Sequence, residues 1–249
     1  RVLPILENNI KCGNSLIGPD FYSFQTPPIP LFTKEGERGG VDDDIRRINV
    51  FDWEKEFPQI FPSPLTGEGK GGGGFDAVIG NPPYGAFFND IEKAYVKEQY
   101  KSYKNRYDSY IYFIEKAISL ANGNGRISFI TPELWLRLES TAPLRKLIAE
   151  NTGFETLRIF GENVFDKAVV HTIVFNFVKG QSVDRLSIND GVREWHLLSS
   201  AWTSSPAYVI DYRIGSESEG VISKIENVSS PLIKFGEVIQ GITPYDKYR

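Results

Sequence analysis

Residues 75–84 read Phe75-Asp76-Ala77-Val78-Ile79-Gly80-Asn81-Pro82-Pro83-Tyr84. The apolar run through Val78 and Ile79 predicts a buried β-strand, and Gly80 allows the backbone to turn as that strand leaves its sheet. Neither proline can donate a backbone hydrogen bond, so the strand must end there in a stiff loop. The pattern therefore predicts that Asn81 and Tyr84 are held rigidly at the carboxyl end of a buried strand, where open α/β sheets bind their ligands.

The tetrapeptide Asn81-Pro82-Pro83-Tyr84 resembles the catalytic motif of the adenine-specific N6 DNA methyltransferases, which reads Asn-Pro-Pro-Tyr after a hydrophobic strand. The resemblance implies S-adenosylmethionine as cofactor, double-stranded DNA as partner, catalysis by residues 81–84, and stacking of Tyr84 on the target base. Related motifs occur in other amino-group methyltransferases, so the match is more specific for methylation at a planar nitrogen than for DNA. A proline-rich turn after a strand, without chemistry, is the alternative.

The composition of the chain excludes several classes of protein. A chain of 249 residues can bury a substantial core. Its net charge of −4 argues against general nucleic-acid affinity but leaves room for a local basic surface. Cys12 is the only cysteine, which excludes a disulfide framework and a cysteine-ligated zinc site within the chain, and two histidines cannot form a dense metal cluster. Without a long apolar run or a leader peptide, the sequence predicts a cytoplasmic enzyme with no membrane partner.

The segments after Tyr84 alternate between helix and strand patterns. Apolar residues follow a helical period over 110–120, and Asn122-Gly123-Asn124-Gly125 is predicted to cap that helix. Residues 126–131 predict the next parallel strand, and a second helix is expected over about 140–149. This alternation predicts a doubly wound α/β sheet. Two further strands, at 156–160 and 169–178, correspond in the family to the last strands of the catalytic sheet, one of which is antiparallel.

Two other loops receive roles from the resemblance. In the family, a strand-end Asp or Asn accepts a hydrogen bond from the adenine amino group of S-adenosylmethionine, which places Asn14 in that role with Ser15 beside it. An ordinary Asn-Ser turn is the alternative. The loop at 162–165 resembles one that packs an aromatic ring on a flipped base, which would be Phe165, and a plain core position is its alternative.

The remaining motifs are less specific. The glycine tract at 67–74 formally matches a dinucleotide fingerprint, but it precedes a strand instead of following one, so we interpret it as a linker. Lysines and tyrosines alternate over 93–107, which suits either phosphate contact and base stacking or a solvated helix face anchored by its tyrosines.

The predicted fold class is α/β, a partial Rossmann-like methyltransferase sheet that lacks its first strands, followed by the start of a target-recognition domain. We expect a catalytic domain at 1–180 with a loop-rich insertion at 19–74, a β-rich extension or linker at 181–230, and the beginning of the recognition domain at 231–249. The family's glycine-rich cofactor loop and acidic ribose contact are not found, and the chain contains no methionine, so we expect a segment of a longer polypeptide. Whether the segment alone binds cofactor or is active stays open.

The predicted function is S-adenosylmethionine-dependent methylation of the adenine N6 amino group in DNA, with base flipping, in a type II or type IIG restriction-modification system. A nuclease and a specificity domain, fused or associated, would lie outside this segment. Two alternatives stay open. One is a protein-glutamine or RNA-guanine amino methyltransferase, which can share Asn-Pro-Pro-Tyr, and the other is a catalytically inactive DNA-binding fragment.

Overall fold

A computed structural model describes residues 10–24, 48–61, 73–85, 88–105, 108–160, 171–213 and short stretches of 221–236. Residues 1–211 form one compact unit and residues 212–249 a second one. The predicted start of a recognition domain, 231–249, lies almost wholly outside the described residues. No helix in the described segments combines the length and the hydropathy that crossing a membrane requires.

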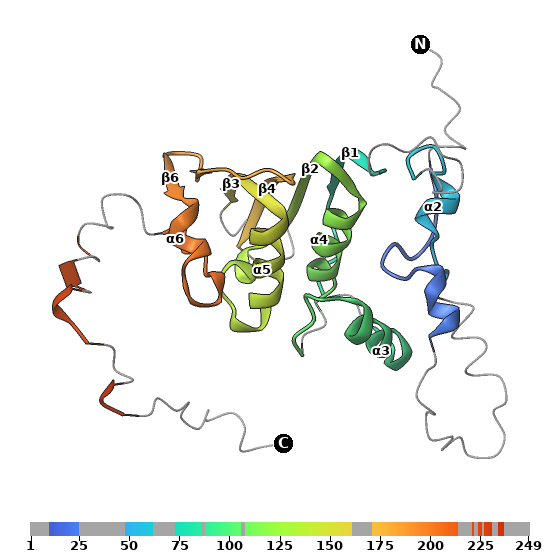
Figure 1. Cartoon of the computed structure of the whole chain (residues 1–249), viewed down its shortest axis with the longest axis horizontal. Helices are drawn as coiled ribbons and strands as arrows, with labels where there is room; N and C mark the ends of the chain where they lie inside the picture. Colours follow the sequence, from blue (N-terminus) through green and yellow to red (C-terminus); the bar gives the residue numbers. More distant parts are fainter. Residues whose placement is uncertain are drawn as a thin grey trace, which may run out of the picture. The chain divides into compact units, whose positions relative to one another are not determined.

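A six-stranded sheet forms the centre of the first unit, in the order β1-β2-β4-β3-β5-β6 (Figure 1). The strands are β1 Phe75–Gly80, β2 Ala121–Pro132, β3 Thr152–Phe160, β4 Thr172–Lys179, β5 Arg185–Asn189 and β6 Glu194–Leu198. β1 is parallel to β2, β5 is parallel to β3, and β4 is antiparallel to both β2 and β3. The carboxyl ends of β1, β2, β3 and β5 therefore share one edge of the sheet. The predicted α/β class is confirmed, and of the two strands expected at 156–160 and 169–178, the second is antiparallel to its neighbours.

Along the chain, two helices lie between β1 and β2 and one lies between β2 and β3, as the alternating pattern predicts; one more precedes β1 and one follows β6. They are α2 Trp53–Glu56, α3 Asp90–Gln99, α4 Ser109–Leu120, α5 Ala142–Asn151 and α6 Ser199–Thr203, with 3₁₀ turns η1 Pro19–Ser23, η3 Glu133–Leu136, η4 Glu139–Thr141 and η5 Pro206–Tyr208. α4 packs against β1 and β2, and α5 packs against β3 (Figure 1). Between helices and sheet lies an aromatic core in which Trp135, Phe154, Phe175 and Phe177 are almost fully buried. Burial of these rings is the main source of stability in such a sheet.

The prediction that Ile79 lies in a buried strand is wrong. β1 is an end strand of the sheet, and within the described residues it pairs with β2 alone. The side chain of Ile79 is 80% exposed as a result. The apolar run correctly predicted a strand, but an apolar sequence does not reveal how many neighbours that strand has.

The predicted helix cap at 122–125 is also wrong. α4 ends at Leu120, and the next residue, Ala121, is already extended and pairs with Phe75. The pairing then jumps to Ala77 with Arg126, so residues 122–125 bulge from β2. The end of the helix is capped instead by Lys179, whose ammonium donates to the carbonyl of Ala121 at 2.7 Å. A cation at a helix C-terminus is favourable because the helix dipole is negative there.

The tyrosines of the lysine-rich segment anchor α3 to the N-terminal segment. Tyr95 and Tyr100 are buried, and their hydroxyls bond the carboxylate of Asp20 and the carbonyl of Leu16. Burial raises the pKa of both phenols, so both remain neutral donors. Of the two readings of this segment, the helix face anchored by tyrosines is confirmed, and base stacking by these two rings is excluded by their burial.

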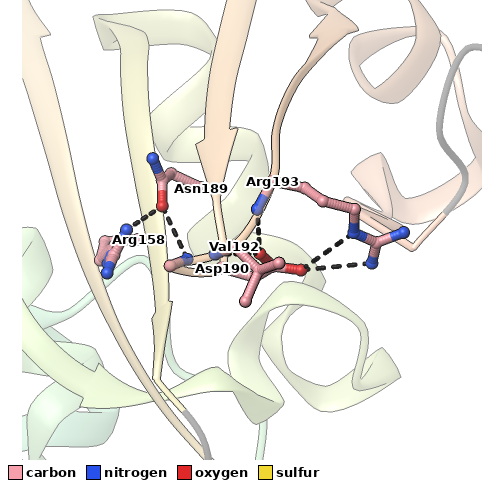
Figure 2. A network of polar contacts seen from close by, with 6 residues as sticks. Arg158, Asn189, Asp190, Val192 and Arg193 are labelled. Carbon is pink, nitrogen blue, oxygen red and sulfur yellow. Dashed lines mark hydrogen bonds and ion pairs between the residues drawn. The ribbon is translucent and has the colours of Figure 1, made fainter.

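Figure 2 shows the turn between β5 and β6, where Asp190 organises the backbone. Its carboxylate accepts hydrogen bonds from the amides of Arg193 at 2.7 Å and Val192 at 2.9 Å, and from the Arg193 guanidinium at 3.2 Å. The neighbouring Asn189 accepts from the Gly191 amide and from Arg158 of β3, which joins the turn to the sheet. Gly191 has a φ of 94°, a conformation that favours glycine.

We expect the turn to make stability depend on pH through Asp190. The Arg193 amide, followed by the Val192 amide, holds the pKa of this carboxyl below its ordinary value. A carboxyl with a lowered pKa stabilises the fold above the unfolded value of about 4, and that contribution is lost as the pH falls through the folded pKa. Urea unfolding of wild type and Asp190→Asn between about pH 3 and pH 7 should show a stability difference that is constant at neutral pH and shrinks below about pH 4. A difference that stays the same over this range would contradict the assignment.

Candidate active site

Residues 81–84 follow β1 at the sheet edge where the carboxyl ends of the parallel strands meet, as the sequence predicts. Pro82 is buried, which fixes the base of the loop, whereas Asn81 is exposed. In the part of the chain that the structure describes, the carboxamide of Asn81 makes no hydrogen bond. Its oxygen is therefore available to accept a hydrogen bond from a donor outside the chain.

The other end of the loop is attached to the first turn of α4. The hydroxyl of Ser109 donates to the carbonyl of Pro83 at 2.6 Å. The ring of Tyr84 meets the buried ring of Tyr110 edge-on, with centroids 6.2 Å apart and planes at 82°. Burial raises the pKa of Tyr84, which keeps its phenol neutral. The loop is thus held by β1 at one end and by α4 at the other.

A pocket of about 220 Å³ opens beside the loop. Its walls come from the end of β1, from α4, from Phe129 of β2 and from two residues of the N-terminal segments, and its lining is Ser15, Trp53, Val78, Ile79, Gly80, Asn81, Pro82, Phe113, Lys116, Ala117, Leu120 and Phe129. Ser15, predicted from the sequence as part of a cofactor site, therefore lies in the same pocket as Asn81. The indole of Trp53 holds it there by donating to the Ser15 carbonyl at 3.2 Å.

Asn14 lies next to this pocket but does not line it. Its side-chain oxygen accepts from the Leu16 amide at 3.2 Å, and its amide group donates to Glu92 of α3 at 3.4 Å. The first bond is that of an Asn turn, the alternative considered from the sequence. An amide oxygen has two lone pairs, so Asn14 retains the capacity to accept one more hydrogen bond.

Lys116 is a pocket residue that the sequence did not single out. Burial lowers the pKa of its amine, and the carboxylates of Asp20 and Glu54 oppose that shift. Because it is half-buried on α4, its charge is poorly hydrated and favours an anionic group in the pocket. Its only sequence signal is a polar residue within the apolar period of the predicted helix.

Other candidate positions lie elsewhere. Phe165, predicted to stack on a base, is outside the described residues. A larger groove of about 880 Å³ lies between the amino end of β3, the loop after β4 and α6, at the sheet edge opposite Asn81, and it contains none of the predicted residues. Over the described ranges, histidine, cysteine and carboxylate side chains form no group that could hold a metal ion.

Much of this chain is similar in sequence to known proteins. A family model described as Eco57I restriction-modification methylase matches residues 5–165. The type II restriction enzyme and methyltransferase RM.Eco57I of Escherichia coli is 27% identical over 266 residues, covering 99% of this chain and 23% of that protein. The type II methyltransferase M.HincII of Haemophilus influenzae is 32% identical over 120 residues, covering 46% of this chain and 24% of its own length.

A third relative, the type II methyltransferase M.TthHB8I of Thermus thermophilus, is 32% identical over 151 residues, which cover 57% of this chain and 33% of that protein. The chain thus spans between about a quarter and a third of the length of these curated relatives.

Proposed function

This chain belongs to the Eco57I restriction-modification methylase family, and on that premise we propose that it is part of a DNA methyltransferase that modifies the N6 amino group of adenine. The family match and the six-stranded sheet also confirm the predicted Rossmann-like methyltransferase fold. The single observation that carries the proposal is Asn81, an exposed amide on a rigid proline loop at the ligand-binding edge of that sheet.

The chemistry needs hydrogen-bond acceptors more than it needs a base. The lone pair of an exocyclic adenine nitrogen is delocalised into the ring, which makes the nitrogen a poor nucleophile. Acceptors for both of its N–H groups favour a more tetrahedral nitrogen and release that lone pair. We assign these roles to the side-chain oxygen of Asn81 and the backbone carbonyl of Pro82. After the N–C bond forms, the nitrogen is acidic and loses its proton to solvent without a dedicated base.

The pocket beside Asn81 suits part of a cofactor. Sites for whole drug-sized ligands measure about 300–1,000 Å³, so a pocket of about 220 Å³ holds only a portion of such a molecule. We propose that its apolar walls, with Lys116 and Ser15, receive part of S-adenosylmethionine, and that Asn14 contributes from beside them. When bound, this cofactor supplies an electrophilic methyl group on a sulfonium sulfur that leaves as a neutral thioether. The rigid loop aligns the adenine nitrogen with that methyl group, and such alignment is worth several kcal/mol.

The target base must leave the duplex to reach Asn81. Flipping a base costs a few kcal/mol, and stacking on an aromatic ring recovers part of that cost. We propose that Tyr84 provides such a ring, with Phe165 as its second partner. We further propose that the partner is double-stranded DNA. We propose a catalytic domain at 1–180, an extension or linker at 181–230 and the beginning of a recognition domain at 231–249. A nuclease and a specificity domain would belong to the same restriction-modification system.

The test is methyl transfer by the full-length protein with S-adenosylmethionine carrying a labelled methyl group. Duplex DNA with all four bases, RNA and a glutamine-containing protein are offered separately, and the modified product is digested and identified. We expect label in DNA, recovered as N6-methyladenine. Label in RNA guanine or protein glutamine would support the alternative enzyme classes, and DNA binding that is independent of cofactor without transfer would support an inactive binding fragment.

A further inference from the structure

Ser109 is the residue that fixes the last free torsion of the catalytic loop, and we infer that it is a positioning residue for Tyr84. The inference rests on the proposed function and extends it to a residue outside the Asn-Pro-Pro-Tyr motif. Its basis is the hydrogen bond from the Ser109 hydroxyl to the Pro83 carbonyl, at 2.6 Å, from a side chain that is 1% exposed.

A count of the backbone torsions shows why one hydrogen bond can have this effect. The rings of Pro82 and Pro83 lock φ at about −65° in both residues. Asn81 and Pro82 each precede a proline, which restricts their ψ to extended values. Beyond the φ of Asn81, where the chain leaves β1, the ψ of Pro83 is the one soft torsion left before Tyr84. Because ψ sets the direction of the carbonyl, a hydroxyl that holds the Pro83 carbonyl also sets where the chain of Tyr84 begins.

The prolines also leave the loop dependent on an outside donor. Neither Pro82 nor Pro83 has an N–H group, so this part of the loop can be anchored through its carbonyls alone. Ser109 begins α4, whose twelve residues pack on β1 and β2, so the donor stands on a rigid element. The next residue, Tyr110, presents its buried ring edge-on to Tyr84. One turn of α4 therefore fixes both the backbone and the ring of the residue proposed to stack on the target base.

The chain offers a matched control on the same helix. The hydroxyl of Ser119 donates to the carbonyl of Lys116 at the same distance of 2.6 Å, but Ser119 is exposed and this bond lies within α4. Ser109→Ala and Ser119→Ala each remove one hydroxyl from the same helix. Only Ser109→Ala also removes a hydrogen bond to the loop. Ser109→Thr keeps the hydroxyl, and Ser109→Cys keeps the volume with a weak donor.

The first measurement follows the loop itself, without substrate. The backbone NMR order parameters of Tyr84 and Gly85 should fall from values typical of rigid backbone, about 0.85, to below about 0.6 in Ser109→Ala, fall partly in Ser109→Cys, and stay unchanged in Ser109→Thr and Ser119→Ala. Equal order parameters in Ser109→Ala and Ser119→Ala would overturn the inference. This readout decides the positioning role even if the full-length protein transfers no methyl group, an outcome that would overturn the proposed function alone.

The second measurement uses methyl transfer by the full-length protein. We expect about a tenfold lower kcat for Ser109→Ala, rescue by Ser109→Thr, and little change in KM for duplex DNA, because contacts with the unflipped duplex are unaffected. Since Ser109 acts through Tyr84, the loss should disappear when the same change is made in a Tyr84→Ala background. Independent, additive losses would show that Ser109 does not act through Tyr84. If Ser109→Ala fails to fold, Ser109→Cys provides the same comparison.

Discussion

Asn81→Ala should lower methyl transfer by at least about 100- to 1,000-fold, the usual loss when one preorganised hydrogen-bonding group is removed from a reacting centre, while the free energy of unfolding stays the same. The two effects separate because the Asn81 side chain is exposed and forms no hydrogen bond within the described residues. Its removal therefore leaves no buried group unsatisfied and no cavity. The measurement is kcat/KM for labelled methyl transfer to duplex DNA, with urea unfolding of the same preparations.

Two further variants sharpen this expectation. Asn81→Asp keeps an acceptor oxygen at the same place, so it should retain more activity than Asn81→Ala. Asn124→Ala is the control for methyl transfer, since Asn124 is an exposed asparagine near the amino end of β2, away from the edge where β1 ends, and its side-chain oxygen accepts from Gln181 and not from a group of the site. Wild-type turnover in Asn81→Ala would rule out the catalytic role of Asn81 and remove the main support for the proposed function.

The parts of the fold that sequence predicts well are those determined by neighbouring residues. The helix expected at 110–120 is α4, Ser109–Leu120, and the strand expected at 126–131 lies within β2. The end of β1 at Gly80 is predictable for the same reason, because the two prolines that follow Asn81 stop a strand irrespective of the rest of the fold. The half of the site formed by residues 81–84 therefore follows from a local pattern.

The other half of the site depends on contacts between distant segments, which no local pattern reveals. Ser15 reaches the pocket because Trp53 bonds its carbonyl, across a sequence separation of 38 residues. Residues 122–125 carry strong turn signals, yet they bulge from a strand because Ala121 and Arg126 on either side of them both pair with β1. The carbonyl of Ala121 is bonded by Lys179, 58 residues away. Ile79 is exposed because of its strand's place at the end of the sheet. In each case a tertiary contact overrides or completes the local preference.

Arg145→Ala should destabilise the protein by about 3–5 kcal/mol, the range for truncating a large buried side chain to alanine, because it opens a cavity and removes several buried hydrogen bonds. Arg145 is fully buried, and burial lowers its pKa to about 10, so its guanidinium is still charged at neutral pH. It donates to the carbonyls of Trp135 at 2.7 Å and Leu138 at 2.8 Å, and to that of Ala207 at 3.0 Å. These bonds join the turns after β2 to η5, where Ala207 has a left-handed φ of 58°. Urea unfolding measures the loss.

The size of this effect comes from the carbonyl groups more than from the charge. Arg145→Met fills most of the volume but removes one donor from each of three carbonyls. Those of Trp135 and Leu138 still accept from Thr141, so the change should destabilise by roughly 1–3 kcal/mol, whereas Arg145→Lys should recover part of the loss. Arg126→Ala is the control, because Arg126 is an exposed arginine paired with Glu155 and should cost less than about 1 kcal/mol. If Arg145→Met were as stable as wild type, packing and the hydrogen bond from the Ile210 amide to the Leu136 carbonyl would be enough to hold the turns and η5 together. The left-handed backbone at Ala207 would then be stable without a hydrogen bond from Arg145 to its carbonyl. Burial of the guanidinium would in that case destabilise the fold, without a compensating gain.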